Sequence, residues 1–516
     1  MRQAILSLLM SRFLRLASIS LLVPASALFA FATDTRLAES VRAGDIASTR
    51  SLLAQHVDVN AIQPDGMTAL IWAAHNSDFP AAELLLKAGA NVKIVSRYGV
   101  SALTEAATQG NSALVEALLK AGADPNAELP EGDTALMLAS RTGDVPTVKA
   151  LLDHGAQVEA KESWHGETAL MSAAGENHPD VVRLLIEHGA DVNAQGRELK
   201  YPLIVKQDVM SLPPVGGLTP LMEAARENSF EAAQVLLKAK ANPNLRTPDK
   251  MTALLIAITN AHWDMANLLI ESGADVNDGS LSQIEEVRNT RTTLSRPASG
   301  GPDSMTSLEV IKALLAHGAK ADSILAGPVP TRSGGAGPGA HDFTALYRAA
   351  KTADLEVMAL LFEKGADAKL ANKDGETPLL AAAGVAPGGR GGGGNFGVGG
   401  KSTTNEERIK AIQMCLDHGA DINALDGLNQ SAAHGAANLG ADEIVQFLAD
   451  HGAKLDVKDK RERTPLDVAN AKPLPGPPVQ GPPLVKHEST AALLRKLLGM
   501  PAETGKTSDA IVAAAQ

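Results

Sequence analysis

Two glycine-rich stretches of this chain carry residue types that bind phosphates in other proteins. Gly399-Gly400-Lys401-Ser402 has the letters that end a phosphate-binding loop, in which backbone N–H groups and a lysine surround the phosphates. That loop needs a glycine five positions before its Gly-Lys pair, and residue 395 is asparagine. Gly392-x-Gly394-x-x-Gly397 matches a dinucleotide fingerprint by letter. Because both stretches follow a predicted helix where the chemistry requires a strand, we interpret them as a low-complexity loop.

Histidines form the second group with the potential for chemistry, since five of them directly precede a glycine that ends a predicted helix. Zinc ligands must converge within about 2 Å of one metal, whereas packed helices lie about 8–10 Å apart. We therefore expect these histidines to contact the negative ends of their helices, not a metal. They are His154, His188, His317, His418 and His451.

Signatures of catalysis are missing from the rest of the sequence. No Gly-x-Ser-x-Gly elbow, His-Glu-x-x-His pair or calcium loop occurs. The single cysteine, Cys415, cannot form an internal disulfide, and its apolar helical surroundings predict a small buried hydrophobic residue. We predict no enzymatic activity, no cofactor and no metal.

A repeated pattern organises most of the chain. It begins at ten Thr or Ser residues whose spacings are 33 or 34 residues, or longer where segments are inserted. Alanine lies five residues after all ten, and leucine lies two residues after nine of them. A Gly-Ala pair usually follows after 21 residues, preceded by paired apolar residues. The ten residues are Thr68, Ser101, Thr134, Thr168, Thr219, Thr252, Thr344, Thr377, Ser431 and Thr464.

Each feature of the pattern predicts a local structure. Thr or Ser caps a first helix by accepting a bond from a backbone N–H, and Pro220, Pro378 and Pro465 occupy the first helical position after their caps. Leu and Ala at helical spacing give this helix a narrow apolar face. A second, Leu-Leu-containing helix packs behind it and ends at a left-handed glycine. The following Asp-x-Asn predicts a turn towards the next repeat.

This pattern resembles the ankyrin repeat, a 33-residue unit with a Thr-Pro-Leu-His-x-Ala signature. Thr219-Pro220-Leu221-Met222-Glu223-Ala224 and Thr377-Pro378-Leu379-Leu380-Ala381-Ala382 carry it, although only His434 keeps the signature histidine. The resemblance implies an all-α solenoid of stacked helix-turn-helix repeats with β-turn fingers, and a concave surface that binds proteins.

The repeats and insertions predict the following organisation. The first half comprises a signal peptide (1–32), a capping half-repeat (35–60) and ankyrin repeats (61–278). A degenerate repeat follows (279–322), whose first helix is lost or displaced within 280–304, and then a Gly/Pro-rich insertion (323–341). The remainder comprises ankyrin repeats with a glycine-rich insertion at 385–404 (342–463), a capping repeat with a proline-rich insertion at 472–487 (464–499) and a disordered tail (500–516). A further insertion covers 195–216.

The first 32 residues predict export. Arg2, Arg12 and Arg15 precede an apolar stretch, and Ala30-Phe31-Ala32 supplies a small-x-small cleavage pattern, as does Ala25-Ser26-Ala27. An uncleaved membrane anchor is the alternative. We expect a periplasmic or secreted protein, and the single cysteine favours a bacterial source.

Charge indicates which partners suit the chain. The formal charge is −12, and removal of residues 1–32, with three arginines and no acid, leaves −15. A chain this acidic is unsuited to binding nucleic acid. Its charge favours a protein partner with a basic or neutral surface. We expect a monomer whose resemblance-implied contacts are Trp72, Tyr98, Glu105, Leu138, Trp164, His165, Glu223, Ile256 and Arg348. The alternatives are an effector acting on another cell's protein, and a ligand-binding protein that uses the inserted loops.

Overall fold

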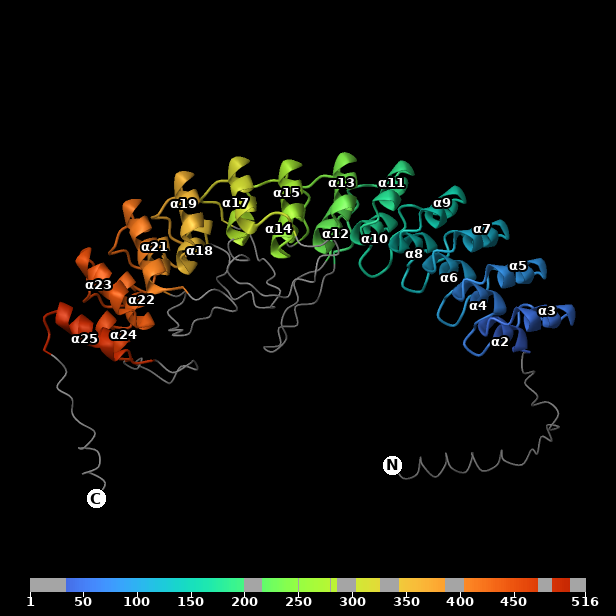
Figure 1. Cartoon of the computed structure of the whole chain (residues 1–516), viewed down its shortest axis with the longest axis horizontal. Helices are drawn as coiled ribbons and strands as arrows, with labels where there is room; N and C mark the ends of the chain where they lie inside the picture. The colour runs from blue at the N-terminus through green and yellow to red at the C-terminus, as the bar shows by residue number, and fades with distance from the viewer. Residues whose placement is uncertain are drawn as a thin grey trace, which may run out of the picture. The chain divides into compact units, whose positions relative to one another are not determined.

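The computed structural model describes residues 34–198, 216–248, 250–278, 280–284, 303–324, 343–385, 403–471 and 485–501. The predicted signal peptide, most of each insertion and nearly all of the predicted tail lie outside these residues. The chain divides into two compact blocks, an N-terminal block (Met1–Ala127) and a C-terminal block (Glu128–Gln516). Each block is a stack of helical hairpins (Figure 1).

Every hairpin pairs a first helix with a second helix. The first helices are α2 (Arg36–Arg42), α4 (Ala69–His75) and α6 (Ala102–Thr108) in the N-terminal block, and α8 (Ala135–Thr142), α10 (Ala169–Gly175), α12 (Pro220–Glu227), α14 (Ala253–Thr259), α18 (Ala345–Thr352), α20 (Pro378–Ala382), α22 (Ala432–Leu439) and α24 (Pro465–Ala469) in the C-terminal block. The second helices are α3 (Ile46–Ala54), α5 (Phe79–Lys87) and α7 (Ser112–Lys120), then α9 (Val145–Asp153), α11 (Pro179–Glu187), α13 (Phe230–Lys238), α15 (Trp263–Glu271), α17 (Ser307–Ala316), α19 (Leu355–Glu363), α21 (Asn405–Asp417), α23 (Asp442–Asp450) and α25 (Glu488–Leu497).

The predicted caps begin the first helices. Each of the ten Thr or Ser residues is the N-cap of its helix, and nine accept a side-chain bond from the N–H three residues on, at 3.0–3.4 Å. The exception is Ser431, whose N–H donates to Nδ1 of His434 at 3.1 Å. Pro220, Pro378 and Pro465 occupy the first helical position, where the missing N–H costs nothing.

The core of each stack lies between neighbouring hairpins. Leu70 and Ala73 of α4, and Leu85 of α5, are fully buried. Within the N-terminal block α2, α4 and α6 pack in sequence, and in the C-terminal block α8, α10, α12 and α14 do so. The second helices form a parallel row of contacts, such as α15 with α17 and α17 with α19. Each hairpin therefore buries its apolar surface against its neighbours.

Asparagine side chains bridge successive repeats where a second helix has ended. The residue that ends the helix has a left-handed backbone, usually a glycine such as Gly89 (φ +86°), although Lys240 (φ +70°) also adopts it. In the turn that follows, Oδ1 of Asn193 accepts the N–H of Asn242 at 2.7 Å. Equivalent bonds are made by Asn60, Asn244, Asn277 and Asn423 to the N–H groups of Asn91, Asp275, Lys320 and Lys454 at 2.6–2.8 Å.

The degenerate repeat keeps its place in the stack. Residues 280–284 are helical, and Leu281 and Ile284 are buried. On one side, Gln283 donates to Thr259 of α14 at 3.5 Å; on the other, the Ser282 hydroxyl accepts from Nε of Arg348 in α18 at 3.0 Å. At least one turn of a first helix is therefore present at 280–284, within the range 280–304 in which the sequence predicts that this helix is lost or displaced.

Antiparallel pairing is confined to isolated bridges within the described ranges. Two of them, Val95 with Ser101 and Glu128 with Thr134, close ordinary turns before a cap. The other two, Glu198 with Gly216 and Ile324 with Thr344, join the residues that flank segments 199–215 and 325–342. Both insertions thus begin and end at a bridged turn of the same kind as the two ordinary turns. In the described part of the chain, no helix has the length and apolar character needed to cross a bilayer.

Candidate protein-binding surface

We call the five residues before each first-helix cap a finger. Each finger that the structure describes in full closes on itself, because the N–H of its first residue donates to the carbonyl of its last. Ser96 donates in this way to Val100 at 2.8 Å, and Asp426 donates to Gln430 at 3.0 Å. The finger that ends at Glu167 is one residue longer and begins at Glu162, whose N–H donates to the Glu167 carbonyl at 3.0 Å.

The side chain of the first finger residue accepts hydrogen bonds from backbone N–H groups of the finger tip. Oγ of Ser96 accepts N–H bonds from Tyr98 at 3.3 Å and from Val100 at 3.1 Å. In the same position, Oδ1 of Asn372 accepts from Asp374 and Glu376, each at 2.9 Å. Because every such bond fixes a backbone group of the tip, the finger has a defined conformation.

Glu162 gives the strongest example of this support. Its buried carboxylate accepts backbone N–H bonds from Trp164 at 2.5 Å, from Glu167 at 3.0 Å and from His165. Burial opposes ionisation of this group, but the three backbone donors outweigh it, so the pKa of Glu162 is lowered. A charged acceptor therefore holds the finger that presents Trp164.

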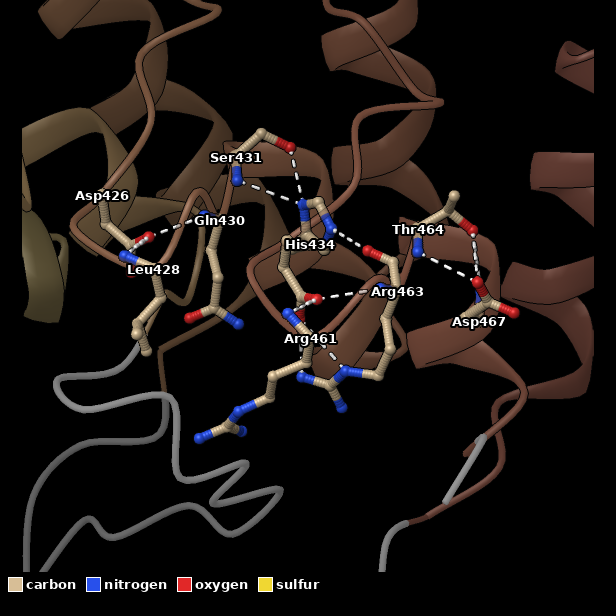
Figure 2. A network of polar contacts seen from close by, with 10 residues as sticks. Asp426, Leu428, Gln430, Ser431, His434, Arg461, Arg463, Thr464 and Asp467 are labelled. Atoms are coloured by element: carbon tan, nitrogen blue, oxygen red, sulfur yellow. Dashed lines mark hydrogen bonds and ion pairs between the residues drawn. The ribbon is translucent and has the colours of Figure 1, made fainter. Parts of the chain in front are cut away.

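Figure 2 shows two consecutive fingers of the C-terminal block. Asp426 accepts N–H bonds from Leu428 at 2.9 Å and from Gln430 at 2.6 Å, while Asp459 accepts from Arg461 at 2.8 Å and from Arg463 at 2.9 Å. The guanidinium of Arg463 also donates to Asp459 at 2.9 Å, forming a buried ion pair. Burial alone would raise the pKa of Asp459, but these hydrogen bonds outweigh burial, so the pKa is lowered.

Neighbouring fingers are joined directly. The N–H of Gly427 donates to the Asp374 carbonyl at 2.6 Å, and the N–H of Lys460 donates to the Leu428 carbonyl at 2.9 Å. The first contact requires glycine at position 375, where φ is +79° and a Cβ would lie 2.8 Å from the Gly427 nitrogen. The fingers form a continuous, hydrogen-bonded row here.

In both blocks, exposed apolar side chains concentrate on or next to the fingers. Within the described residues, ten large apolar side chains are exposed. Six of them lie on fingers or on the residues that lead into them, and a seventh, Ile324, is bridged to the cap Thr344. Tyr98 is 68% exposed and Trp164 is 65% exposed, both at finger tips. The seven are Ile62, Val95, Tyr98, Trp164, Ile324, Leu370 and Leu425.

Sequence reasoning placed Tyr98, Trp164 and His165 at finger tips, and all three are exposed there. It missed Ile62, Val95 and Leu425, each of which lies six residues before a cap. Their common offset from Thr68, Ser101 and Ser431 was the signal that would have found them.

Three of the nine predicted contact residues are buried in this structure. Leu138, Glu223 and Ile256 lie four residues after their caps and are 9%, 4% and 8% exposed. Glu223 pairs with Arg226 at 2.6 Å, and burial is the main cause that raises its pKa to about 7. The sequence pattern identifies the helix position four residues after each cap. The exposed fraction of the side chain at that position differs from repeat to repeat.

The other three predicted residues are partly exposed. Nε1 of Trp72 donates to Gln63 at 2.7 Å, and the Arg42 guanidinium lies 4.9 Å from the centre of a Trp72 ring. Glu105 contacts Nδ1 of His75 at 3.2 Å, and His75 packs edge-on against Trp72.

Arg348 lies in the C-terminal block, 5.7 Å from the centre of the Phe343 ring. Trp72 and Glu105 belong to one cluster in the N-terminal block, which His75 connects.

The potentially reactive side chains serve the fold. Nδ1 of His188, His317, His418 and His451 lies 2.8–2.9 Å from the carbonyl oxygen four residues before it, as a capping donor would. Cys415 is buried, which raises the pKa of its thiol to about 12 and confirms the structural interpretation. The described residues contain no group of three or more His, Cys, Asp or Glu arranged to hold a metal.

Comparison with known proteins finds a family match for part of the repeat array. Residues 37–128, 106–196 and 199–280 match a family model described as "Ankyrin repeats (3 copies)". The prediction of an all-α ankyrin-repeat solenoid is confirmed by this match and by the helical hairpins described above.

The curated relatives share only part of their length with this chain. The mouse B-cell lymphoma 3 protein homolog is 27% identical over 50% of this chain and 49% of its own length. Human ankyrin repeat and SOCS box protein 6 is 32% identical over 30% of this chain and 33% of its own length. The human ASB11 ankyrin repeat domain is a solved structure with 25% identity and a TM-score of 0.39, covering 46% of this chain and 98% of that domain. The chain thus spans about half or less of the curated relatives.

The histidine that links the two fingers of Figure 2 makes stability depend on pH. His434 is buried; its Nδ1 accepts the Ser431 N–H, so its Nε2 carries the proton and donates to the Arg463 carbonyl at 3.0 Å. Burial lowers the pKa of His434 from 6.5. The unfolded chain then binds more protons than the folded chain below pH 6.5, so stability is full above that pH and falls as the pH decreases through it.

We predict that wild type loses about 1 kcal/mol more unfolding free energy than His434→Gln between pH 7.5 and 5.5. Glutamine can accept and donate similar bonds but does not titrate. Urea unfolding of both proteins at the two pH values measures the difference, and equal losses would contradict this role.

Proposed function

We propose that this ankyrin-repeat solenoid is a scaffold that binds a partner protein through its fingers and the adjoining first helices. The observation that carries the proposal is the concentration of exposed apolar side chains on the fingers. Single exposed apolar residues are ordinary on a protein surface, but a series at equivalent positions of successive repeats is typical of an interaction site.

The construction of the fingers supports the same function. Tyr and Trp contribute large contact areas with few rotatable bonds, and they dominate binding energy at many interfaces. Tyr98 and Trp164 extend from tips that Ser96 and Glu162 hold by backbone hydrogen bonds. Because a tip of defined conformation loses little freedom on binding, more of the contact energy contributes to affinity.

The charge of the chain favours a particular class of partner. With residues 1–32 removed the formal charge is −15, from −12 plus the loss of three arginines. A partner with a basic patch would be attracted and oriented before contact, and added salt would slow its association. The proposal includes neither a reaction catalysed by this chain nor a nucleic-acid partner.

We predict that substitution of residues on fingers, or leading into them, strongly reduces partner capture, while substitution elsewhere does not. Val95 and Val485 provide a matched pair, since they are 53% and 52% exposed and only Val95 leads into a finger. The chain without residues 1–32 would be crosslinked in its native compartment, and the captured proteins quantified. Val95→Ser and Trp164→Ser should each reduce capture of the partner about tenfold.

The matched control is Val485→Ser, which should leave capture within about twofold because it is an exposed substitution away from the fingers. All three changes are at exposed positions, so differences in folding are small. Equal loss in Val95→Ser and Val485→Ser, or full capture by both finger variants, would contradict the proposed surface.

We also propose that the chain is exported. The support is the arrangement of Arg2, Arg12 and Arg15 before an apolar stretch that ends in Ala30-Phe31-Ala32. Mass spectrometry of the chain from its source cells should find a new N-terminus after Ala32 or Ala27. Recovery of the chain from the cytoplasm with residues 1–32 intact would overturn this part of the proposal.

A further inference from the structure

The C-terminal block contains a pocket that the proposed function does not yet use. It has a volume of about 340 Å³, which is in the size range of small-ligand sites. It lies beside the start of α18, between the turn that follows α17 and the finger that precedes α20. Its lining consists of Asp322, Ile324, Thr344, Tyr347, Leu370, Ala371, Asn372 and Lys373.

The walls of this pocket are apolar. Ile324 and Leu370 line it and are 47% and 38% exposed, so both present hydrocarbon surface to solvent. They belong to the finger row, because Ile324 is bridged to the cap Thr344 and Leu370 leads into the finger that ends at Glu376. A partner that covers the fingers would also cover this pocket.

Behind the pocket lies a buried carboxylate with one unused oxygen. Glu376 is 1% exposed, and its Oε2 accepts the Tyr347 hydroxyl at 2.7 Å and the Asn372 amide at 3.0 Å. Both donors line the pocket. Oε1 of Glu376 is buried and has no hydrogen-bond partner. A buried carboxylate oxygen without a donor is costly. Glu376 does not itself line the pocket, and Tyr347 and Asn372 stand between its carboxylate and the pocket.

The charges around this carboxylate are mainly negative. Burial is the main cause that raises the pKa of Glu376, and the nearby carboxylates of Asp426 and Asp374 add to the effect. Burial and Glu376 also raise the pKa of Tyr347, so its hydroxyl remains a donor. Asp322 adds a carboxylate to the lining, where Lys373 is the one basic residue. The pocket therefore combines apolar walls with one carboxylate in its lining, Asp322, and a second carboxylate, Glu376, behind Tyr347 and Asn372.

We propose that this pocket receives a lysine or arginine side chain of the partner protein. Such a side chain has an apolar stem, which fits the walls formed by Ile324 and Leu370, and a cationic head with several donors. The head would lie near Tyr347 and Asn372, where it can interact with the Glu376 carboxylate and the Asp322 rim. The assignment rests on the proposed function, because it names the partner side chain that one part of the finger row selects.

Small probes test the pocket separately from any partner. The full chain, with ¹³C-labelled Ile and Leu methyl groups, would be titrated with Nα-acetyl-lysine methylamide and Nα-acetyl-arginine methylamide. Nα-acetyl-norleucine methylamide, which has a similar stem without the charge, is the control. We expect at least one cationic probe to shift the Ile324 and Leu370 signals saturably, and norleucine to leave them in place.

Two variants test the roles of the charges. Glu376→Gln keeps an acceptor for Tyr347 and should weaken binding of the cationic probe about tenfold, the scale of a charge-assisted bond. Lys373→Gln removes the opposing cation and should bind the probe at least as well as wild type. Equal shifts by norleucine, unchanged binding by Glu376→Gln, or loss of binding in Lys373→Gln would each overturn the assignment.

The two proposals can fail independently. If the probes do not bind but finger substitutions still strongly reduce capture, the pocket assignment is wrong and the binding surface stands. If the cationic probes bind as expected but finger variants capture the partner fully, the pocket is a basic-side-chain site and the finger surface is wrong.

Discussion

No repeat of this chain can bury its apolar surface alone, and that constraint governs the whole structure. A hairpin of two short helices has an apolar face that only a neighbouring hairpin can cover. The fully buried side chains, such as Leu85 in α5 and Leu185 in α11, lie in these stacked hairpins. Stability in such a stack is a sum of repeat and interface contributions, so the contacts between neighbours must be kept at every step.

Three kinds of polar contact keep neighbouring repeats in register, in addition to apolar packing. Asparagines such as Asn423 bridge the turns after the second helices. Finger backbones join directly, as Gly427 does to Asp374. On the opposite side, residues that begin a second helix reach back to the preceding first helix, as Ser229 does to the Gly175 carbonyl at 2.7 Å. The repeats are thus fixed at both ends of the first helix as well as along its face.

The same fixation produces the candidate function. A finger that is tied to its own base and to its neighbour can expose Tyr98 or Trp164 without collapsing onto the surface. Where the series is interrupted, residues 280–284 maintain the stack, and the next two turns enclose the pocket in front of Glu376. The irregular repeat at 280–324 therefore adds a pocket to the finger surface.

The sequence predicted the features that recur in every repeat. Caps such as Thr68, the first-position prolines and the buried Cys415 follow from local rules that neighbouring repeats do not change. Features that depend on the adjacent repeat were not predictable in this way. The burial of Glu223 and Ile256, the helical turn at 280–284 and the unpaired oxygen of Glu376 all arise from contacts between repeats.

The central claim is that the finger row makes the principal contact with a partner, and amide hydrogen exchange tests it most directly. Exchange of the chain would be compared with and without the captured partner. The account predicts slower exchange at finger amides, including those of Tyr98, Trp164 and residues 371–376, and unchanged exchange along the exposed faces of the second helices. Protection confined to second helices such as α11 and α13, with the fingers unaffected, would contradict it.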